Sequence, residues 1–167
     1  MNDENFNFML FNTNDFDSEE EIDNRHLGIW QWLYENPEIQ ALFFNFGKGD
    51  NGDVILTTGA ADELDRSYID GSMMKHYDFS IIQFMPLNQG VANDIENVAV
   101  MFDTEKLIAW VKKQNRDRNF PKFPKDCYVQ RVEVLQNVPT AQQTNDTEAK
   151  YIFSCRVYYV QKSEVRL

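Results

Sequence analysis

Three acidic residues have the type and setting that metal-assisted hydrolysis would need. Asp70 lies in a turn signal, whereas Asp78 and Glu133 lie in segments that alternate like β-strands. Carboxylates that project from strands can bind Mg²⁺, which takes oxygen ligands and can activate a water molecule. These acids follow no ligand spacing, and most of the 27 acidic residues fall in turns or on helix faces. A small metal-dependent hydrolase is therefore retained only as an alternative function.

The histidines and cysteines are too scattered to suggest a metal centre or a nucleophile. His26 shares an apolar helical face, which predicts a core or boundary residue, and His76 has no cysteine or second histidine nearby. Cys155 falls on an apolar strand face with no base beside it in sequence, so we expect a small core residue. Cys127 and Cys155 are expected to stay reduced, because two cysteines are no disulfide framework in a chain of 167 residues.

The glycine-rich segment 47–52 (Gly-Lys-Gly-Asp-Asn-Gly) has a composition that can cradle a phosphate group. It lacks the Gly-Lys-Ser/Thr ending of nucleotide-binding loops, and no helical pattern follows it. The segments 39–46 and 54–58 on either side have strand character. We therefore predict a turn between two strands, and no bound cofactor.

Alternating polarity predicts the strands that must position these side chains. Residues 73–87 alternate along their whole length, with one largely apolar face and one largely polar face that includes His76. Residues 127–135 predict another strand, which is expected to pair with a long last strand over 151–160. On the first of these two strands, one face carries Tyr128, Val132 and Val134. On the second, an unbroken apolar face carries Tyr151, Phe153, Cys155, Val157 and Tyr159.

Helical spacing predicts two main helices. The first begins at a capping box, in which the Ser18 hydroxyl and the Glu21 carboxylate satisfy opening N–H groups, and it stops at Asn36-Pro37. The second spans residues 95–116, with Asp103-Thr104 as a pair that could disturb its middle.

These elements predict an α+β fold, a mostly antiparallel sheet packed against two main helices in a single domain over residues 18–167. Residues 1–17 form a separate N-terminal arm, and residues 137–149 form a long polar loop between the last two strands. The helix face that should cover the last strand carries Leu107, Ile108 and Val111.

Composition suits one folded chain, since 43% of the residues are apolar and 14% are aromatic. The formal net charge of −11 argues against broad electrostatic binding of nucleic acid, because DNA carries about one negative charge per 1.7 Å. That charge gives either plain solubility or a negative wall along which DNA passes without sticking. The opening residues lack a secretory signal, and no apolar run reaches the roughly 20 residues that span a bilayer, so no membrane partner is expected.

Several short segments resemble one family by their order. They are the YxDGS turn at 68–72, KLIAW at 106–110, QNRDRNFP at 114–121, VEVL at 132–135 and YIFSCRVYY at 151–159. Their succession resembles that of tail-terminator (tail-completion) proteins, often labelled minor capsid proteins, of long-tailed phages that infect Gram-positive bacteria. The resemblance covers roughly residues 20–162 and leaves the Phe/Asn-rich arm outside it.

The resemblance implies an α+β subunit of a closed ring, expected to be a hexamer, that caps the tail tube and faces the head connector. The implied partners are other copies of the chain, the major tail tube protein and the head–tail connector proteins, with DNA only as passing cargo. It implies no cofactor and no catalysis. The implied location is the virion neck, after synthesis in the bacterial cytoplasm. Another neck or head-completion protein is the alternative within the same class.

We expect partner contacts on the arm, on the basic end of the second helix and on the long loop, because termini and loops carry recognition on a rigid scaffold. The basic side chains also suit the helix dipole on a solvated face, and this simpler role stays open. The expected contact residues are Phe6, Phe8, Phe11, Phe16, Lys112, Lys113, Arg116, Arg118, Thr140, Gln142 and Gln143.

Overall fold

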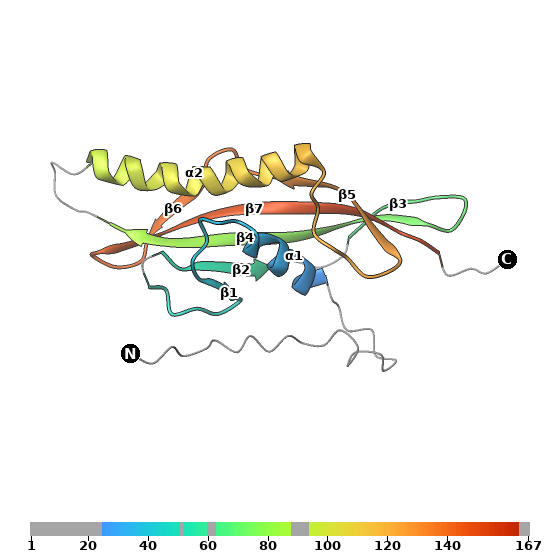
Figure 1. Ribbon diagram of the computed structural model, residues 1–167, viewed down its shortest axis with the longest axis horizontal. Helices are drawn as coiled ribbons and strands as arrows, with labels where there is room; N and C mark the ends of the chain where they lie inside the picture. The colour runs from blue at the N-terminus through green and yellow to red at the C-terminus, as the bar shows by residue number, and fades with distance from the viewer. Residues whose placement is uncertain (1–24, 51, 60–62, 88–93, 164–167) are drawn as a thin grey trace.

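The structure, a computed structural model, describes residues 25–50, 52–59, 63–87 and 94–163 (Figure 1). The arm at 1–17 and the capping box at 18–21 lie outside these residues. The elements are α1 (Arg25–Tyr34), β1 (Leu42–Phe44), β2 (Val54–Thr58), β3 (Glu63–Ser67), β4 (Met73–Pro86), α2 (Asp94–Asp117), β5 (Cys127–Val134), β6 (Thr140–Gln143) and β7 (Glu148–Gln161).

Two long strands, β4 and β7, run antiparallel along their full 14 residues and form the spine of the sheet. The strand order is β1-β2-β4-β7-β5, and only the β1–β2 pair is parallel. β3 pairs with the start of β4, and β6 pairs with the start of β7, so these short strands lie at opposite ends of the sheet (Figure 1). The predicted α+β fold with a mostly antiparallel sheet is confirmed.

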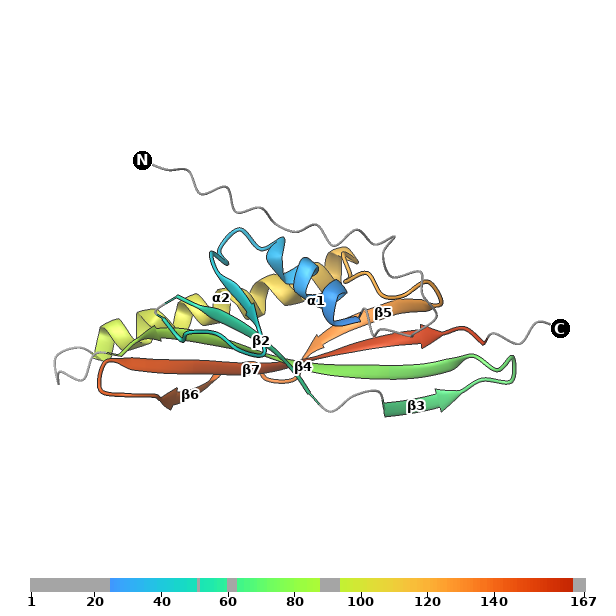
Figure 2. The same ribbon diagram turned by 90° about the horizontal axis from the view of Figure 1, so that it is seen from below.

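Both helices cover the same face of the sheet (Figure 2). Trp32 of α1 packs on Trp110 of α2 with ring centroids 5.0 Å apart, and its Nε1 donates a 2.8 Å hydrogen bond to the Asn119 carbonyl. A Cβ atom at Gly28 would lie 1.9 Å from the Lys122 carbonyl oxygen. Glycine is therefore required where α1 meets the segment that follows α2. We call the other face of the sheet, away from α1 and α2, the open face.

The core lies between the helices and the spine. Phe153, Cys155, Val157 and Tyr159 are fully buried in one cluster with Leu107, Ile108 and Val111, which confirms the predicted cover of the last strand. Tyr151 is also buried but belongs to a smaller cluster with Met85 and Ala149, beside Val100 and Met101. The apolar face of β7 is thus covered along the length of α2, not only by its second half.

The expected disturbance at Asp103-Thr104 is wrong, because α2 is continuous over 24 residues. Thr104 is fully buried, and its hydroxyl donates a 2.8 Å hydrogen bond to Oε1 of Gln83 on β4. Asp103 accepts a 2.8 Å hydrogen bond from Lys106 one turn later. A polar residue in the helix is tolerated here because the sheet supplies a partner for its hydroxyl.

The expected face of β5 is wrong at Tyr128, which is 46% exposed, whereas Val132 is buried and Val134 packs on the core. The pairing of β5 with β7 shifts register between Val129 and Arg131. A β-bulge inserts one extra residue, so side chains before and after it change face. Val129 therefore joins the core side in place of Tyr128.

Two short strands differ from the expected pattern. The loop predicted over 137–149 contains β6 and part of β7, because the four residues Thr140 to Gln143 pair with β7 although they show no apolar alternation. β3 was not predicted, since it also lacks a repeating apolar face and depends on pairing with β4. The strand expected over 39–46 is limited to the three residues of β1.

Candidate functional site

A projecting hairpin, β3–β4, extends beyond the helical layer at one end of the molecule (Figures 1 and 2). Its tip exposes Tyr68 and, with full exposure, Ile69, and Leu64 is exposed nearer the base, on β3. Isolated apolar residues are common on surfaces, but an apolar group at the tip of a projecting hairpin is well placed to enter a partner.

The predicted YxDGS turn closes this hairpin. The Tyr68 N–H donates to the Ser72 carbonyl at 2.9 Å, and Gly71 adopts φ 79°, which favours glycine. Asp70 Oδ1 accepts hydrogen bonds from the Ser72 hydroxyl at 2.6 Å and from the Ser72 N–H at 3.0 Å. These bonds, the hydroxyl first, lower the pKa of the Asp70 carboxyl. The turn that presents Ile69 is therefore held by a defined set of bonds.

A histidine–aspartate pair fixes the base of the hairpin. The register of β3 on β4 shifts between Leu64 and Arg66, so Asp65 is the extra residue of a bulge. Both Asp65 carboxylate oxygens lie 2.9 Å from Nδ1 of His76, which is buried on β4. On the polar face predicted for His76, the ring thus has a hydrogen-bonding partner that ties β3 to the spine.

Two of the three acids considered for Mg²⁺ lie together on the open face, on either side of an arginine. Arg156 is opposite Asp78 on β4 and opposite Glu133 on β5. Its guanidinium binds both Asp78 oxygens, at 2.7 and 2.8 Å. Asp70 lies apart, in the hairpin turn. The three acids do not converge, and the cation that Asp78 faces is a side chain of the protein itself.

The cysteines and histidines of the described residues occupy structural positions. Burial raises the pKa of the Cys155 thiol far above its usual value, which suits a core residue and opposes nucleophilic reactivity. Cys127 and Cys155 are free thiols. His26 is half-buried and its Nδ1 lies against the Tyr77 hydroxyl, as expected for a boundary residue. Within residues 25–163, leaving aside the gaps in the description, no group of three metal-ligating side chains occurs.

The four basic residues expected to contact a partner all lie exposed at the end of α2. Lys112 donates to Oδ1 of Asn137 at 3.0 Å, and Lys113 lies 3.4 Å from the Asp117 carboxylate. Arg118 adopts φ 56° directly after the helix, and the next residue, Asn119, donates its N–H to the Gln114 carbonyl at 3.0 Å. Arg118 therefore helps to end α2, and Lys112 holds the segment after β5 against the helix. These two residues have structural roles whether or not they also contact a partner.

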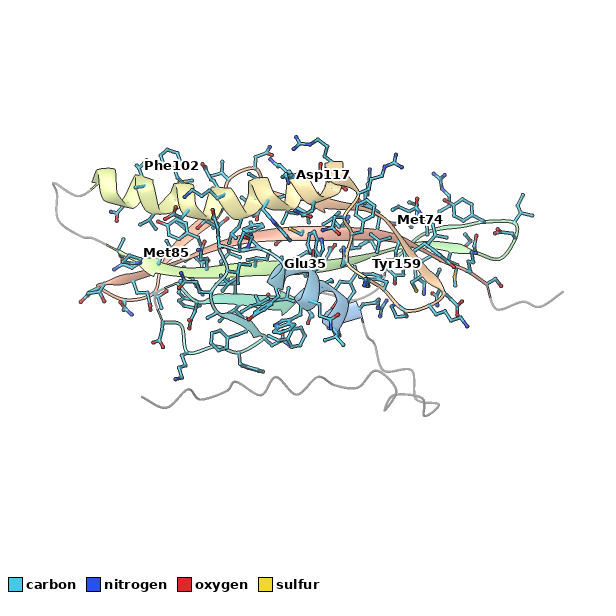
Figure 3. The ribbon with its side chains drawn as sticks, viewed as in Figure 1. Glu35, Met74, Met85, Phe102, Asp117 and Tyr159 are labelled. Atoms are coloured by element: carbon cyan, nitrogen blue, oxygen red, sulfur yellow. The ribbon has the colours of Figure 1, made fainter. Side chains whose placement is uncertain are left out.

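The outer side of α2, away from the sheet, also exposes apolar side chains that sequence patterns missed. Val98 and Phe102 are 51% and 56% exposed, and Figure 3 shows Phe102 on the side of the helix away from the sheet. Leu135 and Val138, between β5 and β6, are exposed as well. Helical spacing carried the signal, because Val98 and Phe102 lie four residues apart on the side of α2 opposite Leu107 and Val111.

The predicted loop contacts, Thr140, Gln142 and Gln143, are all exposed on β6. The arm contacts, Phe6, Phe8, Phe11 and Phe16, lie outside the described residues. None of the described helices is long and apolar enough to cross a membrane. The described contact residues are thus exposed in two places, the basic ones at the end of α2 and the others on the edge strand β6.

Comparison with known proteins adds no relative: neither a scan against protein-family models nor a search of curated proteins gives a match.

Proposed function

We propose that this chain is a structural subunit of a phage neck, resembling the tail terminators that form a ring on the tail tube and join it to the head connector. The order of the sequence segments supports this assignment, and the α+β fold agrees with what the resemblance implies. In this role the chain acts through shape and contact, and it needs no cofactor.

The observation that carries the proposal is the presence of two different exposed apolar surfaces on one subunit. One is the hairpin tip with Tyr68 and Ile69, and the other is the outer side of α2 with Val98 and Phe102. They lie toward opposite ends of the molecule (Figure 1). Contacts between unlike surfaces are heterologous, and when the rotation closes they give a ring instead of a two-fold dimer.

The charge of the chain agrees with a component that surrounds passing DNA. A net charge of −11 repels the phosphate backbone, so a ring of such subunits would not hold DNA in transit. Partners therefore have to be bound through local apolar and basic surfaces, of which the exposed end of α2 is one.

Deletion of the gene from its phage tests this function. We expect filled heads and tails that fail to join, or tails of uncontrolled length, and complementation with the intact chain should restore joined particles. Native mass measurement of the purified protein, alone and with tail tubes, should give a closed oligomer on the tube. Normal infectious particles from the deletion strain would refute the proposal, and joined tails bearing the protein on the head connector alone would favour another neck protein.

A further inference from the structure

We propose that the tip of the β3–β4 hairpin of one copy of this chain docks on the outer side of α2 of a second copy, with Ile69 beside Phe102 and Asp70 beside Lys106. The inference deepens the proposed function, since it rests on assembly between copies and names the two surfaces that meet. It joins the two exposed apolar surfaces of the subunit in one head-to-tail contact.

The hairpin tip is a preformed projection. β4 stays paired with β7 up to its first residue, Met73, so the sheet continues to the foot of the turn. Asp70 accepts two hydrogen bonds from Ser72, which hold the turn itself. Ile69 is fully exposed at the end of this projection. Because the backbone is already ordered, burying Ile69 in a partner costs little further conformational entropy.

The outer side of α2 offers an apolar position between small residues. Phe102 is exposed there, as is Val98 one turn earlier. Ala99 and Ala109 are exposed as well, three and seven residues from Phe102 and on the same side of the helix. Since alanine is short, a partner's side chain can approach the helix backbone beside the Phe102 ring. A bulky aliphatic side chain on a narrow tip, such as Ile69, has the shape for this position.

The charged groups beside these apolar residues have opposite signs on the two surfaces. Asp70 directly follows Ile69, and hydrogen bonding lowers the pKa of its carboxyl, so it is ionised at neutral pH. Lys106 lies one turn after Phe102 and is exposed. Within its own chain Lys106 pairs with Asp103, and both side chains are about half exposed, so that pair contributes little. Docking therefore forms an apolar contact and a charge pair together.

The hairpin tip cannot reach this part of α2 in its own chain. Met101, the neighbour of Phe102, packs against the cluster that contains Met85 at the end of β4. The hairpin turn instead precedes Met73, at the start of β4, and the strand from Met73 to Met85 spans about 40 Å. Figure 3 accordingly shows Phe102 and Met85 at one end of the sheet and Met74 toward the other. The contact therefore requires a second copy.

Contact between unlike surfaces is also favoured over contact between like ones. Two hairpin tips that met about a two-fold axis would bring two Asp70 carboxylates together. Two antiparallel α2 helices that buried both Phe102 rings would set Lys106 of each against Val98 of the other, because both residues lie four positions from Phe102. Each arrangement leaves a charge without an opposite partner, which costs free energy. The head-to-tail contact avoids both and repeats from copy to copy until a ring closes.

Disulfide crosslinking between two full-length variants tests which surfaces meet. Ile69→Cys and Ala109→Cys are purified separately, then oxidised alone and as an equal mixture. The native Cys127 and Cys155 are present in every sample and set the background. We expect a crosslinked dimer in the mixture at least about tenfold above either variant alone, because a disulfide needs Cα atoms within about 7 Å. Gln40→Cys, at another exposed position, replaces Ala109→Cys as the matched control and should stay at background.

A second position covers the other side of Phe102. Ala99→Cys mixed with Ile69→Cys repeats the measurement there, and a crosslink from either alanine position supports the proposal. Crosslinking of Ile69→Cys mainly with itself overturns it, as does background crosslinking from both alanine positions.

Charge reversal tests the contact independently. Lys106→Glu and Asp70→Lys should each weaken association at least about tenfold, since each places like charges in contact. An equal mixture of the two variants should regain wild-type association, because every tip then meets a helix of opposite charge. Native mass measurement should show mixed oligomers with equal numbers of both variants. Asp146→Lys mixed with Lys106→Glu is the matched control and should not restore association.

A milder pair separates the contact from the turn. Asp70→Asn keeps the oxygen that accepts from Ser72 and removes the charge. Asp70→Asn and Lys106→Gln should each weaken association, and the double variant should associate no more weakly than either one. Fully additive losses, or unchanged association, overturn the proposal. Rings on tail tubes without the crosslink from Ile69→Cys to α2 would refute this inference alone, whereas normal particles from the deletion strain would refute the proposed function.

Discussion

The guanidinium of Arg156 and the carboxylate of Asp78 form a two-pronged ion pair across the two central strands, with Nε–Oδ1 at 2.7 Å and Nη2–Oδ2 at 2.8 Å. Hydrogen bonding to Asp78 raises the pKa of Arg156 above its already high value, so the guanidinium stays charged. The side chains are 29% and 28% exposed, which places the pair between a surface bridge and a buried one.

We expect a double-mutant cycle of Asp78→Asn and Arg156→Gln to give a coupling free energy of about 1–2 kcal/mol, because fork geometry favours the pair while partial exposure screens it. Chemical denaturation of the four proteins measures it. The more exposed pair Arg131–Glu133, at 3.7 Å, is the matched control and should couple by less than about 0.5 kcal/mol. Equal coupling in both cycles would show that geometry does not matter here.

Val157→Asp should destabilise the domain by at least about 3 kcal/mol, since Val157 is fully buried and the new carboxylate would find no partner. Thermal and urea unfolding check this. Val160→Asp places the same charge on the half-exposed face of the same strand and should cost about 1 kcal/mol or less. A soluble Val157→Asp protein with an unchanged melting temperature would contradict the assigned core.

Asp70 should titrate below the ordinary aspartate pKa of about 3.9, chiefly because the Ser72 hydroxyl donates to it. Its contribution to the hairpin turn is present above the unfolded-state pKa and is lost as the pH falls through the lowered folded-state pKa. Carboxyl NMR titration measures the midpoint, which should rise in Ser72→Ala and stay low in Ser72→Thr. The same midpoint in all three proteins would show that the hydroxyl is not the cause.

Ile69→Asp should leave the fold intact and weaken assembly, because Ile69 is fully exposed at the hairpin tip. We expect a melting temperature within about 1 °C of the parent and a loss of at least about tenfold in association, measured by analytical ultracentrifugation or by binding to tail tubes. Gln40→Asp adds the same charge at another exposed position and should associate normally. Undiminished assembly of Ile69→Asp would remove the hairpin tip from the interface.

Sequence patterns were sufficient to predict the two strands of the spine, because β4 and β7 each have one largely buried face along their length. From Tyr77 to Met85 and from Tyr151 to Tyr159 the alternation is long enough to fix both strand type and inward face. The amphipathic second half of α2 was predictable for the same reason, through Leu107 and Val111.

The short edge strands were not predictable, since their own side chains do not determine them. β3 and β6 exist because β4 and β7 are longer than their neighbours β2 and β5 and leave pairing positions free. The bulge that turned Tyr128 outward has no side-chain signature either. The candidate contacts depended on the same edges, so the sequence indicated Thr140 and Gln142 as exposed but did not predict a strand there.

The spine also sets the order in which the chain can fold. Asp78 and Arg156 are 78 residues apart in sequence, so the central ladder closes a long loop before it gains any pairing free energy. β5 and β6 pair only with β7, which leaves the ribosome after both of them. During synthesis β2, β3 and β4 can form early. The apolar faces of β4 and α2 stay uncovered until the last strand, β7, has been made. We expect a slow, late folding step that depends on β7, followed by pulse-labelled hydrogen exchange of β4 and β7 amides, and a nascent chain that needs protection from aggregation until then.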